Sequence, residues 1–128
     1  MSSEGDRRTE RGSAIVDFLL VSLLVTVLVL GVIQLALTLH VRTILIDSAA
    51  EGARYGALEG NGLAAGERRA AELISSTLPD AYARDLSAGY VSYGAMTLVE
   101  IRVSAPMPVL GLLGPSGVIA VTGRAVQE

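Results

Sequence analysis

Few side chains in this 128-residue sequence could carry catalysis or bind a metal. There is one histidine, His40, and no cysteine, so thiol chemistry and the usual cysteine and histidine ligand sets for zinc are excluded. No serine stands in a Gly-x-Ser-x-Gly motif, and no phosphate-binding loop of the Walker or dinucleotide type is present. We therefore expect no enzyme activity, no metal and no cofactor. A membrane-tethered enzyme is the less favoured alternative, and loss of activity in His40→Ala would identify it.

Asp17 has the most unusual sequence environment of the ionisable residues. It stands at the head of an apolar run, residues 18–39, interrupted by Ser22, Thr26, Gln34 and Thr38. At about 1.5 Å per residue this run spans roughly 33 Å, enough to cross a hydrocarbon core of about 30 Å. Residues 13–39 are therefore predicted to form a transmembrane helix. A carboxylate at this position is costly unless it is paired or reaches water. By charge placement, Asp17 is either an interfacial acid or an acid with a function of its own.

The flanks of the apolar run set its expected orientation. Residues 1–12 are short, polar and balanced in charge, and we expect this leader to be disordered and cytoplasmic. Three arginines precede the apolar run, against His40 and Arg42 just after it. This excess predicts a single-pass protein in the cell membrane whose N-terminus is cytoplasmic and whose residues 40–128 form an exported domain. The apolar run is too long for an ordinary secretory signal, and no convincing A-x-A site follows it.

Gly12 stands five residues before the acid-aromatic pair Asp17-Phe18. This spacing resembles the processing site of type IV prepilins, and especially of the tight-adherence (Tad) subclass. The resemblance implies that a prepilin peptidase cuts between Gly12 and Ser13. It also implies that Asp17, followed by Phe18, pairs with the N-terminal amine of a subunit during assembly. The family usually has glutamate at this position, and aspartate keeps the charge but shortens the reach.

The helix is predicted to continue to Ala57 or Leu58, with glycines 60 and 62 ending it. Its last turns carry small residues at helical spacing: Ala49, Gly52, Ala53 and Gly56. These favour close packing of another backbone, although glycines there could instead merely weaken the helix. The sequence Gly52-Ala53-Arg54-Tyr55 resembles the segment that follows the membrane helix in TadE-like proteins. For Arg54 and Tyr55 we expect a structural role, holding the helix against the domain.

The remaining sequence predicts an α+β fold. A second, amphipathic helix is expected over residues 63–78, with Asn61 as its cap and a buried stripe of Ala65, Ala70, Leu73, Ile74 and Leu78. A short helical turn follows over 81–86, and then strands over 90–93, 96–104 and 118–126. The three strands predict a small antiparallel sheet covered on one face by the helices.

Between the last two strands lies an unusually apolar loop, residues 106–115. It could fold under the sheet or form a subunit contact. A valine-rich strand, a proline-containing apolar loop and a closing strand with Arg124 and a final Glu128 also resemble the TadE-like pattern. The resemblance therefore extends from Gly12 to the C-terminus.

The resemblance implies a minor pilin or pseudopilin of a Tad-type pilus, a system of the kind that serves adhesion, DNA uptake or secretion. Its expected partners are the prepilin peptidase, other pilins or pseudopilins, the Tad inner-membrane platform and the membrane; after assembly it would lie in the pilus. The net charge is −3, and nine acids outnumber seven arginines after residue 40, so no direct nucleic-acid binding is expected. The alternative is an unprocessed bitopic scaffold for pilus or secretion-system assembly, with residues 106–115 as its contact surface.

Overall fold

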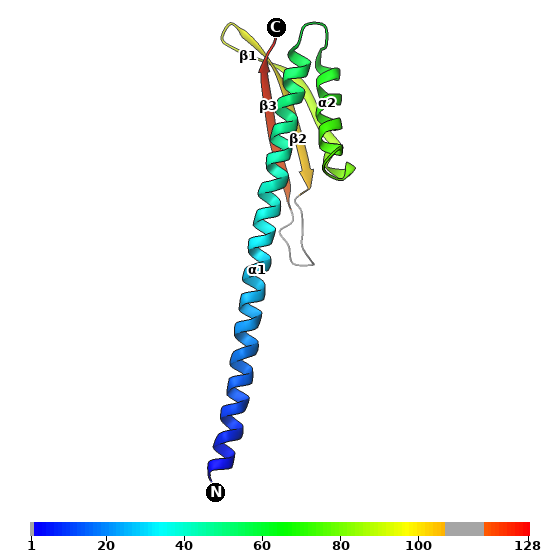
Figure 1. Ribbon diagram of the computed structural model, residues 1–128. Helices are drawn as coiled ribbons and strands as arrows, with labels where there is room; N and C mark the ends of the chain where they lie inside the picture. Colours follow the sequence, from blue (N-terminus) through cyan, green and yellow to red (C-terminus); the bar gives the residue numbers. More distant parts are fainter. Residues whose placement is uncertain (1, 107–116) are drawn as a thin grey trace. The chain divides into compact units, whose positions relative to one another are not determined.

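The computed structural model describes residues 2–106 and 117–128, with side chains from residue 5 onward. The chain divides into two compact units, Met1–Leu35 and Ala36–Glu128, and helix α1 (Ser2–Ala57) begins in the first and ends in the second. The second unit adds α2 (Leu63–Ser75), the 3₁₀ helix η1 (Asp80–Ala83) and strands β1 (Asp85–Tyr93), β2 (Met96–Pro106) and β3 (Val118–Val126). The predicted α+β fold, with one long apolar helix, a second helix and three strands, is confirmed (Figure 1).

In the first unit, α1 presents apolar side chains on all sides. Nearly every side chain of residues 15–35 is exposed, which suits a helix surrounded by lipid rather than by protein. The Thr26 hydroxyl donates to the carbonyl oxygen of Ser22 at 2.7 Å, so this polar group is satisfied within the helix. By length and composition α1 can cross a membrane, as the sequence predicts.

The leader is helical, and the expectation of disorder over residues 1–12 is wrong for residues 2–12. Its polar composition offers no surface to bury, but it contains no proline, and the apolar helix that follows has already nucleated. Extending an existing helix adds one hydrogen bond for each residue fixed, which balanced acids and arginines tolerate.

The connection between the two helices uses two glycines with left-handed backbone conformations. α1 ends at Ala57 as predicted, and Gly60 and Gly62 have φ of 86° and 91°. Gly62, rather than Asn61, is the residue that precedes α2. The Asn61 side-chain amide instead donates to the carbonyl oxygen of Tyr55 at 2.8 Å, so it stabilises the end of α1.

The structure also shifts several predicted boundaries. α2 ends at Ser75, before the predicted residue 78, and η1 replaces the helical turn expected over 81–86. β1 begins at Asp85, five residues earlier than predicted. Its first half alternates correctly, but the inward residues Leu86 and Ala88 are separated by small polar ones and give a weak apolar signal.

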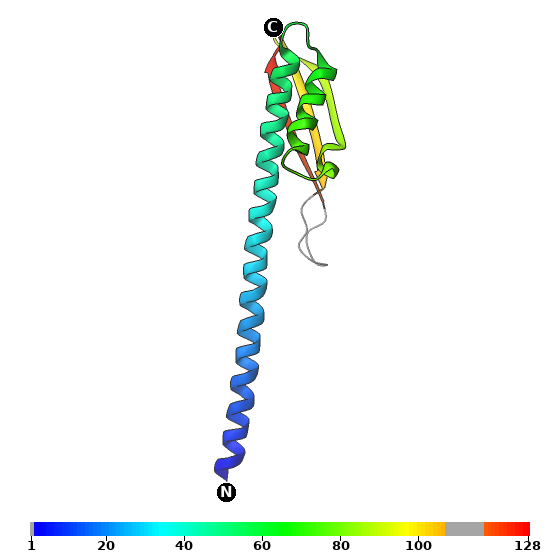
Figure 2. The same cartoon turned by 45° about the vertical axis from the view of Figure 1, so that its right-hand side comes forward.

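The sheet is antiparallel with the strand order β1-β2-β3. A two-residue turn joins Tyr93 to Met96, with Gly94 at φ 61°, the glycine position of a type II′ hairpin. In this register Glu100 lies between Gly89 of β1 and Arg124 of β3. α2 and the C-terminal part of α1 lie on the same face of the sheet, as both views of the ribbon show (Figures 1 and 2).

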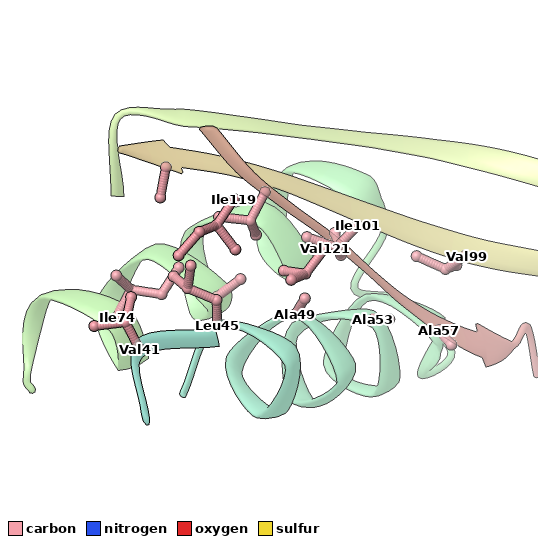
Figure 3. Close-up of a cluster of buried hydrophobic side chains, with 13 residues drawn as sticks. Val41, Leu45, Ala49, Ala53, Ala57, Ile74, Val99, Ile101, Ile119 and Val121 are labelled. Carbon is pink, nitrogen blue, oxygen red and sulfur yellow. The ribbon is translucent and has the colours of Figure 1, made fainter. Parts of the chain in front are cut away.

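The core lies between the two helices and the inner face of the sheet (Figure 3). It contains a row along α1, one residue from each turn, facing the inward residues of β2 and β3 and the end of α2. The labelled members are Val41, Leu45, Ala49, Ala53, Ala57, Ile74, Val99, Ile101, Ile119 and Val121. Alanines predominate in the upper turns of α1, so the helix backbone approaches the sheet closely there. Residues 107–116, which include most of the apolar loop predicted as a core segment or contact, lie outside the described residues.

Candidate functional site

The C-terminal turns of α1 lie against β3 at a glycine. A Cβ added at Gly123 would fall closer than 3.0 Å to main-chain atoms of Ala49 and Ala50. Such distances are essentially never seen for real Cβ atoms, so the site requires the hydrogen of glycine. The Ala57 carbonyl oxygen also accepts a hydrogen bond from the Glu128 main-chain N–H at 3.0 Å. These two contacts fix the position of α1 along its axis relative to β3.

α1 meets α2 through small residues on both helices. A Cβ added at Gly52 would lie 2.7 Å from the Ala70 Cβ and 2.7 Å from the Gly66 carbonyl oxygen. One added at Gly56 would lie 3.1 Å from the Gly66 Cα. Gly52 and Gly56 are thus one turn apart on α1 and face the pair Gly66 and Ala70 on α2, an arrangement that lets the two backbones approach closely.

Arg54 lies on the other side of α1 from these contacts, whereas Tyr55 lies at their edge. Arg54 is exposed and pairs with Glu51 at 3.7 Å, an i,i+3 ion pair whose partners are both solvent-accessible. Tyr55 is 41% exposed and lines a shallow groove between α1 and α2 together with Ala65 and Arg69. The structure places Tyr55 beside α2, whereas the Arg54 guanidinium contacts neither α2 nor the sheet through any described ion pair.

On the opposite face of the sheet lies a charge cluster formed by Glu100, Arg102 and Arg124, here called the triad. Glu100 is only 4% exposed; its Oε1 accepts from Arg102 Nε at 2.5 Å and its Oε2 from Arg124 Nε at 2.6 Å. The hydrogen bond from Arg124, then that from Arg102, holds the pKa of Glu100 below its ordinary value of 4.5, against the opposing effect of burial. The arginine side chains are 68% and 58% exposed, so a net charge of +1 faces outward.

The sequence did not reveal the triad. Alternation along β2 places Glu100 and Arg102 on one face, but Arg124 lies 24 residues after Glu100 and meets it only through the register of β2 and β3. The signal that was available is the position of Arg124 on the outward face of the predicted strand 118–126. Gly66 was missed similarly, because the predicted buried stripe of α2 named Ala65 in its place.

The residues of the predicted processing site lie within α1, in the first unit. Gly12 and Ser13 are exposed, and an added Cβ at Gly12 would meet nothing within 4 Å. Asp17 is exposed and forms no ion pair with any side chain of residues 5–106 or 117–128, and Phe18 is exposed beside it. Their roles in cleavage and assembly stay predictions.

Among the described residues no group of three or more histidine, cysteine, aspartate or glutamate side chains is placed to hold a metal. His40 is exposed on α1. The described surface hollows are shallow and none collects a base, a nucleophile and an orienting acid.

These features define a class: among the described residues one N-terminal helix is able to span a membrane, and its C-terminal turns belong to a small α+β unit. Residues 12–54 match the family model described as TadE-like protein, about a third of the chain. The match confirms the resemblance to TadE-like proteins over residues 12–54 and suggests a membrane protein associated with the Tad pilus. Comparison with curated proteins and with solved structures gives no match.

Proposed function

We propose that this chain is a minor pilin or pseudopilin of a Tad-type pilus, made as a membrane-anchored precursor and cleaved after Gly12. The observation that carries the proposal is the TadE-like match over residues 12–54. The matched segment starts at the glycine of the processing motif, contains Asp17 and Phe18, and runs through the apolar helix to Arg54. The role is structural rather than enzymatic.

The exposed apolar surface of α1 supports a subunit that is stored in lipid and then assembled. A helix that is apolar on all sides is stable in a bilayer and equally stable in a bundle of similar helices. In a bundle Asp17 needs a partner, because it no longer reaches interfacial water and a lone carboxylate in a low-dielectric environment is costly. Cleavage after Gly12 would create an amine at Ser13, and the amine of one subunit would pair with Asp17 of its neighbour.

The three arginines before the apolar run support an N-terminus in the cytoplasm, where a prepilin peptidase would act. The second unit would then lie outside the cytoplasm. The Tad inner-membrane platform and other pilins or pseudopilins would be its partners during assembly, and no direct nucleic-acid partner is proposed.

The deciding experiment determines the N-terminus of the mature chain by mass spectrometry. Membrane and sheared surface fractions are taken from cells that carry the whole pilus system, and from matched cells that lack the prepilin peptidase. We expect a chain beginning at Ser13 in the first cells, including the sheared fraction, and one beginning at Met1 in the second. A chain beginning at Met1 in both cells, confined to the membrane, would refute the proposal.

That last outcome would support the second candidate, an unprocessed bitopic scaffold for pilus or secretion-system assembly. One observation favours this candidate: α1 is continuous from Ser2 through Gly12, so no loop separates the leader from the apolar helix. A scaffold would keep residues 1–12 and would be absent from sheared filaments.

A further inference from the structure

The second unit has two layers, and no described residue of the chain covers the outer surface of either layer. The sheet forms one layer, with the triad at the centre of its outer face. α1 and α2 form the other layer. We propose that the outer face of the sheet binds the outer surface of the helix layer of a second copy of this chain, stacked side by side.

The two outer surfaces carry opposite net charges. The triad presents a net charge of +1 through two arginines held in place by a shared carboxylate. On the outer surface of α1 lie the acids Asp47 and Glu51. At about 100° per residue, Asp47 lies about 160° around the helix from Ala49, which faces the sheet. Asp47 is exposed and forms no ion pair with a described side chain, and Glu51 pairs only with Arg54, so this surface has a net charge of −1.

The charged groups are similarly spaced on the two surfaces. Asp47 and Glu51 are four residues apart on a helix, which places them about 6 Å apart along its axis. Arg124 lies directly opposite Glu100, and Arg102 lies two residues further along β2, about 6.6 Å along the strand direction. The two positive and the two negative groups therefore have nearly the same separation.

The charged groups of the two surfaces also lie at matching positions along the axes of α1 and β3. α1 and β3 run in the same direction, with Gly123 against Ala49 and Ala50 at one level and Glu128 beside Ala57 at another. Measured from the Gly123 contact toward the N-terminal end of α1, Asp47 lies about 4 Å away along the helix axis. The row that pairs Arg102 with Thr122 lies about 3.3 Å away in the same direction. Glu51 and Arg124 both lie just on the other side of this contact. A copy displaced sideways, without rising or falling, would thus place acids opposite arginines.

Apolar side chains also lie at matching positions on the two surfaces, on the side of the charged groups toward the C-terminal ends of α1 and β3. Val91, Leu98 and Val126 form one cross-strand row of the outer sheet face, with Tyr93 and Met96 in the next row. Tyr93 and Val126 are 72% and 51% exposed. At the same height the outer surface of the helix layer offers the exposed side chains of Tyr55 and Leu58. Burying these surfaces against each other would remove exposed apolar area from water.

A symmetric pair is disfavoured by the same charges. Two copies whose α1 segments stay parallel, related by a two-fold axis along the strands, would place one triad directly against the other. Two net positive clusters would then be desolvated together without a counter-charge. The heterologous contact instead joins unlike surfaces and leaves one sheet face free at one end of the pair and one helix surface free at the other, so it propagates into a row.

Site-directed cross-linking tests the contact in full-length chains in membranes, because the chain has no cysteine of its own. One tagged copy carries Asp47→Cys and a differently tagged copy carries Thr122→Cys; both positions are exposed. We expect a mixed disulfide between the two tags. The matched control replaces Asp47→Cys with Ser92→Cys, which is exposed on β1 but away from the proposed contact, and should give no mixed dimer.

A charge substitution provides the second test. With Leu58→Cys and Val126→Cys as the reporter pair, Asp47→Arg should slow cross-linking at least about tenfold at low salt and by less at high salt. Thr43→Arg, also exposed on α1, should have a much smaller effect. Dimers of Thr122→Cys with itself alone, no mixed disulfide from thiols that react with maleimide, or no effect of Asp47→Arg would each overturn the proposal. Leader cleavage is not needed for this contact, so its failure is distinguishable from failure of the proposed function.

Discussion

Replacing Gly123 by alanine should separate α1 from the sheet. The added Cβ would lie against main-chain atoms of Ala49 and Ala50, closer than 3.0 Å, where ordinary contact is 3.4–4 Å. A main chain within a helix cannot rotate out of the way as a side chain can. The helix must therefore move outward by roughly 1 Å, since interiors packed to crystal density hold no space for the methyl group.

The magnitude follows from the side chains that this movement would loosen. Leu45, Ile101 and Val121 lie between α1 and the sheet, and all are nearly or fully buried (Figure 3). Each contributes about 1.5–3 kcal/mol through burial. A radial gap of about 1 Å forfeits roughly a quarter to a half of a dispersion contact. Losing about a third over three side chains gives about 2 kcal/mol, within the range of about 1–3 kcal/mol for overpacked cores.

The assay is urea unfolding of the full-length chain in detergent micelles, followed by pulse proteolysis. The sheet provides its own control in Gly89→Ala, because an added Cβ at Gly89 would meet nothing within 4 Å. We expect the free energy of unfolding to fall by about 2 kcal/mol in Gly123→Ala and to stay within about 0.5 kcal/mol of the parent in Gly89→Ala. Equal urea unfolding midpoints for the two variants would refute the close contact of α1 with Gly123 of β3.

Three further predictions concern the helix contact, the triad and the processing site. Gly52→Ala should cost about 1–2 kcal/mol in the same assay, because overpacking against α2 exceeds the gain of about 1 kcal/mol in helix propensity, whereas Gly31→Ala, with open space around it, should cost nothing; equal effects would contradict the close helix contact. Glu100→Gln should cost about 1–3 kcal/mol at neutral pH. Because the folded-state pKa of Glu100 is lowered, the stabilisation by its carboxylate is fully present above about pH 4.5 and is lost as the pH falls through the folded-state pKa. Equal loss of stability in acid for the parent and the variant would exclude this stabilisation. Gly12→Leu should accumulate as full-length precursor on immunoblots, and Asp17→Ala should be cleaved but missing from sheared filaments; normal processing of the first, or normal incorporation of the second, would remove the assigned role.

Much of the fold follows from local patterns in the sequence. The apolar run and the absence of proline predicted a helix to Ala57, and two glycines placed its end correctly. Strand 118–126 was predicted with its observed bounds, because its β-branched residues give a clear signal. These features depend on each residue and its near neighbours, which is the information that a single sequence carries.

The features that were missed depend on contacts between distant segments. The small residues of α1 indicated close packing, but their partners Gly66 and Gly123 could not be named without knowing how α2 and β3 lie against the helix. The triad likewise requires the register of two strands separated by a long loop. The leader was mispredicted for a different reason: polar composition speaks against a buried helix, but not against extension of a helix that already exists.

The row of contacts along the C-terminal turns of α1 has a mechanical consequence. Val41 to Ala57 lie on one continuous helical segment and pack against the sheet and α2 of the same unit. A pull along the axis of this segment would load these contacts together, in shear, instead of opening them one after another. The unit therefore resists such a force through the whole length of the contact.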